Sequence, residues 1–173
     1  MKTIQNCDID LPELEPVWQD PSENKEHLEA MQKIHSLICV RERSQKELYE
    51  RLIASDFKPS VVKNAVDVAL KCGLISDERY ASAFIRGKTN KGWGKAKIIS
   101  HLHKNGISEQ VIENCSEDFA SSDQEFDRAV KEVKTHPSHS KNPRASLIRR
   151  LVNKGYSFET AHAAVNEALS DAR

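Results

Sequence analysis

The sequence predicts an all-α protein: three tandem three-helix repeats forming an elongated molecule, straight or curved, behind a disordered acidic N-terminal tail. Three observations predict this class. Apolar residues recur with the helical period and not with the alternation of a strand. A segment of about 50 residues occurs three times. Aromatic residues make up only 6% of the chain, with 6 glycines and 6 prolines, and a β-sandwich or barrel usually contains more of them.

The repeat is visible in both apolar and turn positions. The three copies superpose without gaps over residues 48–70, 98–120 and 147–169. Gly106 and Gly155 occupy the same repeat position, where a helix would end in a left-handed residue. The first copy has Asp56 there, one of the few other residue types that tolerate this conformation. We therefore expect each copy to contain a helix, a tight turn and a further helix.

In the first repeat we expect helices over 24–40, 45–55 and 59–71. Ser44 with Glu47 has the spacing of a capping box, which would begin the second helix. Pro59 suits the first turn of the third helix, and Gly73 would end it.

In the second repeat we expect helices over 77–89, 95–104 and 109–119. Ser76 precedes two acids, which the helix dipole favours in a first turn. Gly92 and Gly94 flank a tryptophan in a loop between helices, and Ser108 is the expected N-cap of the last helix.

In the third repeat we expect helices over 123–135, 143–153 and 158–170. Ser122 with Glu125 has capping-box spacing, and Ser157 is the expected N-cap of the last helix. The expected division of the chain is a tail at 1–23 and repeats at 24–74, 75–121 and 122–173.

The expected tail combines Pro12, Pro16 and Pro21 with many acids, a composition typical of disordered or loosely docked segments. Two interpretations stay open for its apolar residues. They are either part of a plain solvated tail or a short docking motif. These residues are Leu11, Leu14, Val17 and Trp18.

Charge is sorted along the chain although its total is zero, with 26 Lys and Arg against 26 Asp and Glu. That balance excludes a uniformly basic nucleic-acid binder. Two stretches, 80–107 and 133–158, contain cations and no acidic residue. The candidate binding residues of the middle repeat are Arg86, Lys88, Lys91, Trp93, Lys95 and Lys97. A second candidate zone is Arg144, Arg149 and Arg150, and its counterpart in the first repeat is Arg41, Arg43 and Lys46.

Each candidate has a structural alternative. The charge runs are either contact surfaces or ordinary solvated helix faces. Trp93 is either an exposed aromatic anchor or a residue that packs between repeats.

Motifs for catalysis, cofactors and metals are not found. Gly87-Lys88-Thr89 ends like a phosphate-binding loop but has Ser82 where that loop needs glycine. The pairs His101 with His103 and His136 with His139 lack further ligands at metal spacing, so we expect solvated histidines. The 4 cysteines form no CxxC pair; Cys39, Cys72 and Cys115 lie in apolar helical patterns, where we expect buried free thiols. Neither an apolar N-terminal run nor a stretch of transmembrane length is evident, so we expect a cytoplasmic protein. Because the catalytic and ligand motifs are missing, we expect a non-enzymatic protein without cofactor or metal.

Several motifs resemble the RecX family. Residues 74–86 (LISDERYASAFIR) contain an acidic pair before an arginine and an aromatic residue. A Gly-aromatic-Gly turn follows in 91–98 (KGWGKAKI), and 102–107 (LHKNGI) completes the signature. Residues 43–48 (RSQKEL) resemble the motif that opens the family's first repeat. The resemblance covers roughly residues 28 to 170, most specifically in the middle repeat.

The resemblance implies a regulator, chiefly an inhibitor, of the RecA recombinase in homologous recombination and DNA repair. Members of the family lodge along the RecA–DNA filament and limit its extension, ATPase activity and strand exchange. Single- or double-stranded DNA is a further implied partner, and we expect a monomer.

Two other classes fit the residues. A stand-alone DNA-binding helical repeat protein would bind naked DNA without RecA, through contacts that weaken with salt. A helical scaffold or adaptor would bind through an apolar groove, with little dependence on salt.

Overall fold

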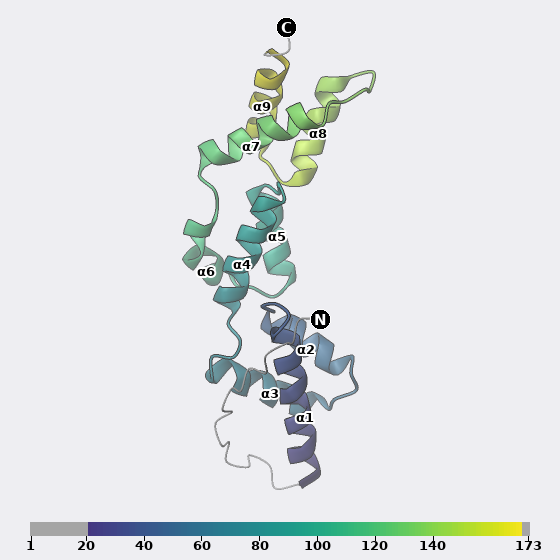
Figure 1. Ribbon diagram of the computed structural model, residues 1–173, viewed down its shortest axis with the longest axis vertical. Helices are drawn as coiled ribbons and strands as arrows, with labels where there is room; N and C mark the ends of the chain where they lie inside the picture. The colour runs from purple at the N-terminus through teal and green to yellow at the C-terminus, as the bar shows by residue number, and fades with distance from the viewer. Residues whose placement is uncertain (1–20, 171–173) are drawn as a thin grey trace, which may run out of the picture.

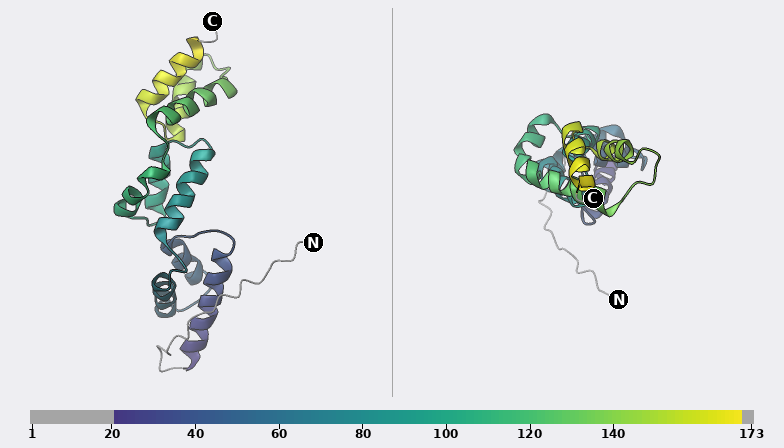
Figure 2. Two further views of the ribbon diagram at one scale, coloured as in Figure 1. Left: turned by 60° about the vertical axis from the view of Figure 1, so that its left-hand side comes forward. Right: turned by 90° about the horizontal axis from the view of Figure 1, so that it is seen from above.

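The computed structural model describes residues 21–170, and every regular element within them is helical. Figure 1 shows three groups of helices stacked along one long axis, and Figure 2 shows the narrow cross-section from above. The elements are α1 (Pro21–Ile38), α2 (Gln45–Ile53), α3 (Pro59–Lys71), α4 (Asp77–Asn90), α5 (Lys95–Lys104), α6 (Glu109–Asn114), the 3-10 helix η1 (Ser116–Asp118), α7 (Ser122–Thr135), α8 (Pro143–Lys154) and α9 (Phe158–Ser170). The predicted all-α, elongated fold class is confirmed. The expected tail falls outside the described residues, apart from its last three positions, which begin α1.

The predicted helices differ from the observed ones mainly at α1 and α6. Helix α1 begins at Pro21 and ends at Ile38, about one turn of helix closer to the N-terminus than expected. Helix α6 ends at Asn114 and is followed by η1, because the side chains of Ser82 and Arg86 on α4 hold Asp118 and draw the chain away from the helical path.

Both predicted capping boxes were partly wrong. The Ser44 side chain accepts from the Glu47 backbone N–H, as expected, but the Glu47 carboxylate turns to arginines instead of closing the box. In the third repeat the box is formed one residue earlier, by Ser121 and Gln124, so α7 begins at Ser122.

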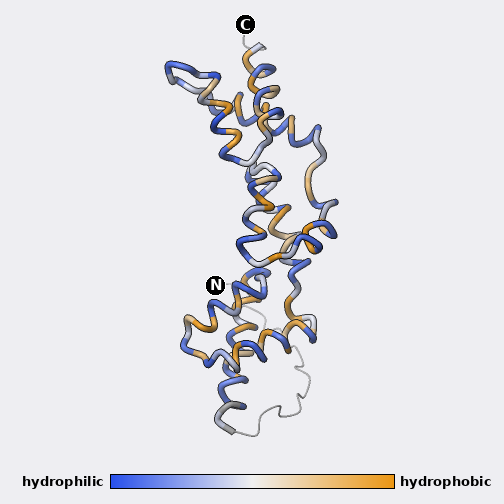
Figure 3. Tube along the Cα trace, turned by 180° about the vertical axis from the view of Figure 1, so that it is seen from behind, coloured by the Kyte–Doolittle hydropathy of each residue, from blue (hydrophilic) through white to orange (hydrophobic). Residues whose placement is uncertain are grey.

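Buried residues form three separate hydrophobic clusters, one for each group of three helices. The first contains Ile34, Leu48 and Val62. The second is built around Ile85, Ile98 and Leu102, and the third around Leu151, Tyr156 and Val165. Figure 3 shows apolar positions recurring along all three helical groups. The division into repeats at 24–74, 75–121 and 122–173 stays a proposal consistent with these clusters.

The cysteine predictions were right for one thiol and wrong for two. Cys115 is buried in the second cluster, whereas Cys39 and Cys72 are exposed. Each of these two lies just past the last residue of its helix, at the end of α1 and of α3, where the apolar pattern no longer faces a neighbouring helix.

The turn positions predicted from the repeat adopt the expected conformation. Gly106 and Gly155 have φ of 82° and 93°, and Asp56 has a φ of 64°. Both glycines also lie at contacts between repeats. A Cβ on Gly106 would lie 2.9 Å from the Lys46 Cβ, and one on Gly155 would lie 2.3 Å from the Lys97 Cβ.

The first two repeats meet through side chains. The Gln45 backbone N–H at the start of α2 donates to Asp77 Oδ1 at 3.0 Å, and its side-chain amide donates to Oδ2 at 3.1 Å. Lys46 Nζ donates to the Lys104 carbonyl at 2.9 Å, at the end of α5. We call this the first junction.

The second and third repeats meet mainly through backbone groups, at what we call the second junction. The Gly94 N–H donates to the Lys154 carbonyl at 2.8 Å, and the Ala96 N–H donates to the Gly155 carbonyl at 3.2 Å. The Lys95 N–H at the start of α5 donates to Glu125 Oε1 at 2.9 Å. At both junctions, a carboxylate of the following repeat therefore accepts a hydrogen bond from the first backbone N–H of the preceding repeat's second helix.

Candidate partner-binding groove at the first junction

A groove of about 640 Å³ opens at the first junction. Its walls come from the α1–α2 loop and α2 on one side and from α4 and the α5–α6 turn on the other. The lining residues are Arg41, Glu42, Glu47, Tyr80, Ala83, Phe84, Gly87, Lys88, Lys91 and Asn105. The groove exists because the first junction is bridged by long side chains, which hold the repeats together while leaving space beside them.

Three predicted binding residues from two repeats come together in this groove: Arg41, Lys88 and Lys91. The Arg41 side chain is 49% exposed. Lys91 is exposed and Lys88 half-buried, and neither forms an ion pair with a carboxylate among the described residues. The groove therefore presents cationic groups whose charge is not balanced nearby.

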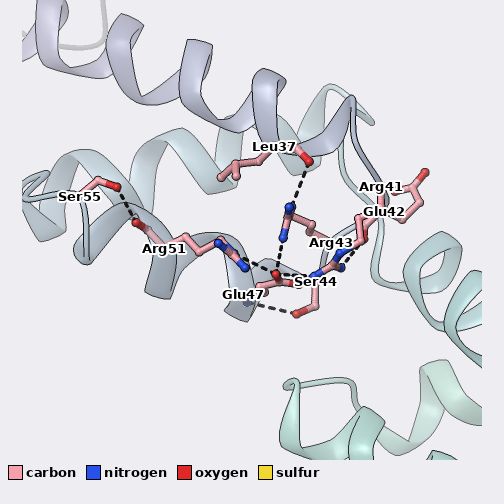
Figure 4. A network of polar contacts seen from close by, with 8 residues as sticks. All are labelled: Leu37, Arg41, Glu42, Arg43, Ser44, Glu47, Arg51 and Ser55. Carbon is pink, nitrogen blue, oxygen red and sulfur yellow. Dashed lines mark hydrogen bonds and ion pairs between the residues drawn. The ribbon is translucent and has the colours of Figure 1, made fainter.

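A charge network centred on Glu47 includes the lining residue Arg41 (Figure 4). Glu47 accepts from Arg41 Nη2 at 2.7 Å, from Arg51 Nε at 2.9 Å and from Arg43 Nη1. Burial alone would raise the pKa of Glu47, but the hydrogen bonds from Arg51, Arg41 and Arg43 together lower it. Glu47 is thus an ionised carboxylate surrounded by three guanidinium groups, and the network keeps a net positive charge.

Arg43 is not available to a partner, contrary to its place among the candidate binding residues. Its side chain is 8% exposed, and its Nε donates to the Leu37 carbonyl at 3.0 Å. It ties the end of α1 to the start of α2 from the inside, so we assign it a structural role.

A row of aromatic rings leads from the groove along the middle repeat. Tyr80 and Phe84 have ring centroids 5.8 Å apart, Phe84 and His101 6.5 Å, and His101 and Trp93 4.8 Å. Lys88 Nζ lies 5.1 Å from the Phe84 centroid and 4.5 Å from that of Trp93. Lys88 thus forms cation–π contacts with both rings, and these contacts connect the groove to Trp93.

Trp93 packs against the cluster of its own repeat, and its role as a partner contact stays a proposal. The ring is half-buried against His101, and the Nζ atoms of Lys88 and Lys97 lie 4.5 Å and 4.6 Å from its centroid. Burial and the neighbouring cations Lys104, Lys97 and Lys88 lower the pKa of His101, which keeps the imidazole neutral. The expectation of a solvated His101 was wrong, because this ring stacks in the row.

The other predicted residues lie outside the groove. Arg86 pairs with Asp118 at 2.8 Å, Lys95 Nζ lies 5.1 Å from the Phe119 ring, and Lys46 bridges the first junction. In the third repeat, Arg144 bonds Asn166, Arg150 bonds the His136 carbonyl, and Arg149 is exposed. The structure therefore does not join the third-repeat zone to the groove.

Sequence reasoning missed the aromatic walls of the groove and two nearby arginines. Tyr80 and Phe84 are four residues apart on α4, so they lie on one face of the helix, and both line the groove. Arg51 and Arg79, which pair with the lining residues Glu47 and Glu42, were not among the candidate residues. A clustering of aromatic and cationic residues on one face of α4 was the available signal.

The described helices include none that is both long and apolar enough to span a bilayer. Across residues 21–170, His, Cys, Asp and Glu side chains do not gather in a group of three that could hold a metal ion.

Comparisons with known proteins identify relatives along most of the chain. The family model described as "RecX, second three-helix domain" matches residues 76–115. The regulatory protein RecX of Chromohalobacter salexigens is 30% identical over 141 residues, covering 79% of this chain and 91% of that protein. The regulatory protein RecX of Vibrio vulnificus is 30% identical over 140 residues, covering 78% of this chain and 87% of that protein.

Solved structures support the fold independently of sequence. The crystal structure of RecX from Lactobacillus salivarius matches with a TM-score of 0.69 at 18% identity, covering 83% of this chain and 97% of that one. A second crystal structure, of a regulatory protein RecX, matches with a TM-score of 0.68 at 20% identity. At these identities the likeness shows the fold alone.

Proposed function

Because this chain belongs to the RecX family of regulatory proteins, we propose that it regulates the RecA recombinase, chiefly as an inhibitor. It would bind the RecA–DNA filament and limit filament extension, ATPase activity and strand exchange. The observation that carries this proposal is the groove at the first junction, which gathers unbalanced cations and aromatic faces from two repeats.

The shape of the molecule supports this partner. Three repeats stacked along one axis present a long surface, which suits contact along several subunits of a filament (Figure 1). A filament of protein and DNA offers carboxylates and phosphates, and both would be attracted to Arg41, Lys88 and Lys91.

We define the groove surface as Arg41, Lys88, Lys91, Trp93 and Lys97. Lys88 is central to it, because it lines the groove and also contacts the rings of Phe84 and Trp93. We propose Arg86, Lys95 and Lys46 only as flanking contacts, since each already interacts within the fold. Arg144, Arg149 and Arg150 form a separate, secondary contact in the proposal.

The test is RecA ATPase activity on single-stranded DNA, titrated with this protein at substoichiometric ratios. We expect Lys88→Glu with Lys91→Glu to raise the concentration for half-inhibition by roughly tenfold or more, because two attractive contacts become repulsive. The matched control is Lys63→Glu with Lys71→Glu, the same charge change on exposed residues of α3 away from the groove. We expect the control to inhibit like the unaltered protein.

Equal inhibition by the groove and control variants, with helical content retained in both, would remove the groove from the proposal. Failure of the unaltered protein to change RecA activity at any ratio would remove RecA regulation itself.

The aromatic row favours one second candidate function, direct binding of single-stranded DNA. Cations beside aromatic rings are the usual chemistry of proteins that bind single strands. Binding of a labelled oligonucleotide without RecA, measured at physiological salt, separates the two. Tight binding lost in Lys88→Glu with Lys91→Glu would favour the DNA-binding function.

A further inference from the structure

Cationic side chains outnumber carboxylates around the groove. The lining contains the cations Arg41, Lys88 and Lys91 and the carboxylates Glu42 and Glu47. Three further arginines, which are not among the lining residues, pair with these carboxylates: Arg43, Arg51 and Arg79. Both carboxylates are already paired, Glu42 with Arg79 and Glu47 with the arginines of its network. The groove is therefore suited to a ligand that carries further carboxylates.

The N-terminal 20 residues of this chain carry the opposite charge, with one lysine against five acids: Asp8, Asp10, Glu13, Glu15 and Asp20. We propose that residues 4–11 of the chain dock into the groove at the first junction. The segment reads IQNCDIDL, and in it two acids alternate with apolar residues.

The length of α1 determines which part of the N-terminal chain reaches the groove. Helix α1 has 18 residues and is therefore about 27 Å long. The groove lies beyond its C-terminal end, since Arg41 follows Ile38 by three residues, while the N-terminal chain joins at Pro21. Spanning 27 Å requires at least about eight extended residues. Residues 14–20 therefore fall short, whereas residues 4–11 reach.

The chemistry of the segment matches the groove. In an extended chain, Asp8 and Asp10 point to one side, and Ile9 and Leu11 point to the other. The groove offers cations from Lys88 and Lys91 together with the apolar ring of Phe84. Trp18 is three residues from Pro21 in the sequence, too few to span the length of α1.

Docking would have a regulatory consequence, and this consequence rests on the proposed function. The segment would cover Arg41, Lys88 and Lys91, the residues proposed to contact the filament. The free protein would then be autoinhibited, and an acidic or phosphate-bearing partner would displace the segment. Docking itself does not depend on RecA and is tested without it.

Native cysteines allow this test on the full chain. Cys7 lies in the segment, and Cys39 is exposed two residues before Arg41. Cys72, exposed at the end of α3 and absent from the groove walls, is the internal control, and Cys115 is buried. Mild oxidation with diamide at low protein concentration, followed by mass-spectrometric peptide mapping, measures how Cys7 divides between the two exposed thiols.

We expect intramolecular Cys7–Cys39 disulfides to exceed Cys7–Cys72 disulfides by roughly fivefold or more, because docking raises the local concentration of Cys7 at one site. Asp8→Lys with Asp10→Lys should abolish this preference. The matched control, Glu15→Lys with Asp20→Lys, makes the same charge change outside the reaching segment and should retain it. Equal yields of the two disulfides in the unaltered chain, or an unchanged preference in the Asp8, Asp10 variant, would overturn docking.

RecA inhibition by the same variants separates docking from the proposed function. We expect Asp8→Lys with Asp10→Lys to inhibit at a lower concentration than the unaltered protein. A clear Cys39 preference, with no effect on RecA from either the unaltered protein or the Asp8→Lys, Asp10→Lys variant, would support docking and contradict the proposed function.

Discussion

The two junctions between repeats use equivalent positions but hold them with different groups. Gly106 lies at the first junction and Gly155 at the second, and both have left-handed φ angles. At the first junction, the three atoms nearest to a Cβ on Gly106 would all belong to the Lys46 side chain, with the Lys46 Cβ at 2.9 Å. At the second, a Cβ on Gly155 would lie 2.6 Å from the Lys97 backbone nitrogen, and one on Gly94 would lie 2.3 Å from the Gly155 backbone.

This difference explains where the groove is found. Backbone hydrogen bonds and close backbone contacts hold the second junction at Gly94 and Gly155, and the hollow beside it, lined by residues that include Arg86 and Arg128, is about 320 Å³. Long side chains hold the first junction, where the hollow is about 640 Å³ and is lined by cations and rings. The first junction therefore offers the larger opening to a partner.

Replacing each of three glycines with left-handed φ angles by alanine would measure the difference in tightness between the two junctions directly. A Cβ on Gly73 would meet nothing within 4 Å, so Gly73→Ala reports backbone strain alone, about 1–2 kcal/mol. We expect Gly106→Ala to cost more than Gly73→Ala, because the Lys46 Cβ, which is fixed to the α2 backbone, would lie 2.9 Å away and must shift. Gly155→Ala should cost about 3 kcal/mol or more, because the backbone of Lys97 cannot move aside cheaply. Urea unfolding followed by circular dichroism measures these losses.

Equal losses at Gly106 and Gly155 would show that the two junctions are equally tight, and the contrast between them would be wrong. Because all three positions need a left-handed residue, the strain common to them cancels in the comparison.

The charge network beside the first junction gives a smaller, pH-dependent effect. Glu47→Gln should destabilise the protein by about 2 kcal/mol at neutral pH, since the buried Arg43 loses its ionised partner. The pKa of Glu47 is lowered in the folded protein, so its contribution is present above the pKa of the unfolded chain and is lost as pH falls through the folded value. The difference between variant and unaltered protein should therefore shrink below about pH 4.

Glu50→Gln is the control for this measurement. The Glu50 side chain is 64% exposed and lies 3.9 Å from Lys46, so its replacement should change stability by no more than about 0.5 kcal/mol at any pH. A Glu47→Gln effect that stays constant down to pH 3 would contradict the assigned role of the carboxylate.

The sequence predicted what depends on local chemistry. The helical period, the left-handed turn residues and the Ser76 and Ser108 caps are properties of short segments, and the structure confirms them. The sequence did not predict the burial of Arg43 or the hydrogen bonds from Gln45 to Asp77, because these depend on how distant segments pack. The groove itself arises between two repeats, so charge patterning identified its cations but not its walls.

The central claim is that the open first junction carries the partner contact, and hydrogen exchange tests it most directly. Backbone amide exchange of the full chain would be compared with and without RecA filaments on single-stranded DNA. We expect exchange to slow in residues 41–47 and 80–93, which contain most of the residues that line the groove, and to change less in residues 143–150. Slowing confined to the third repeat, with the groove segments unchanged, would contradict the account.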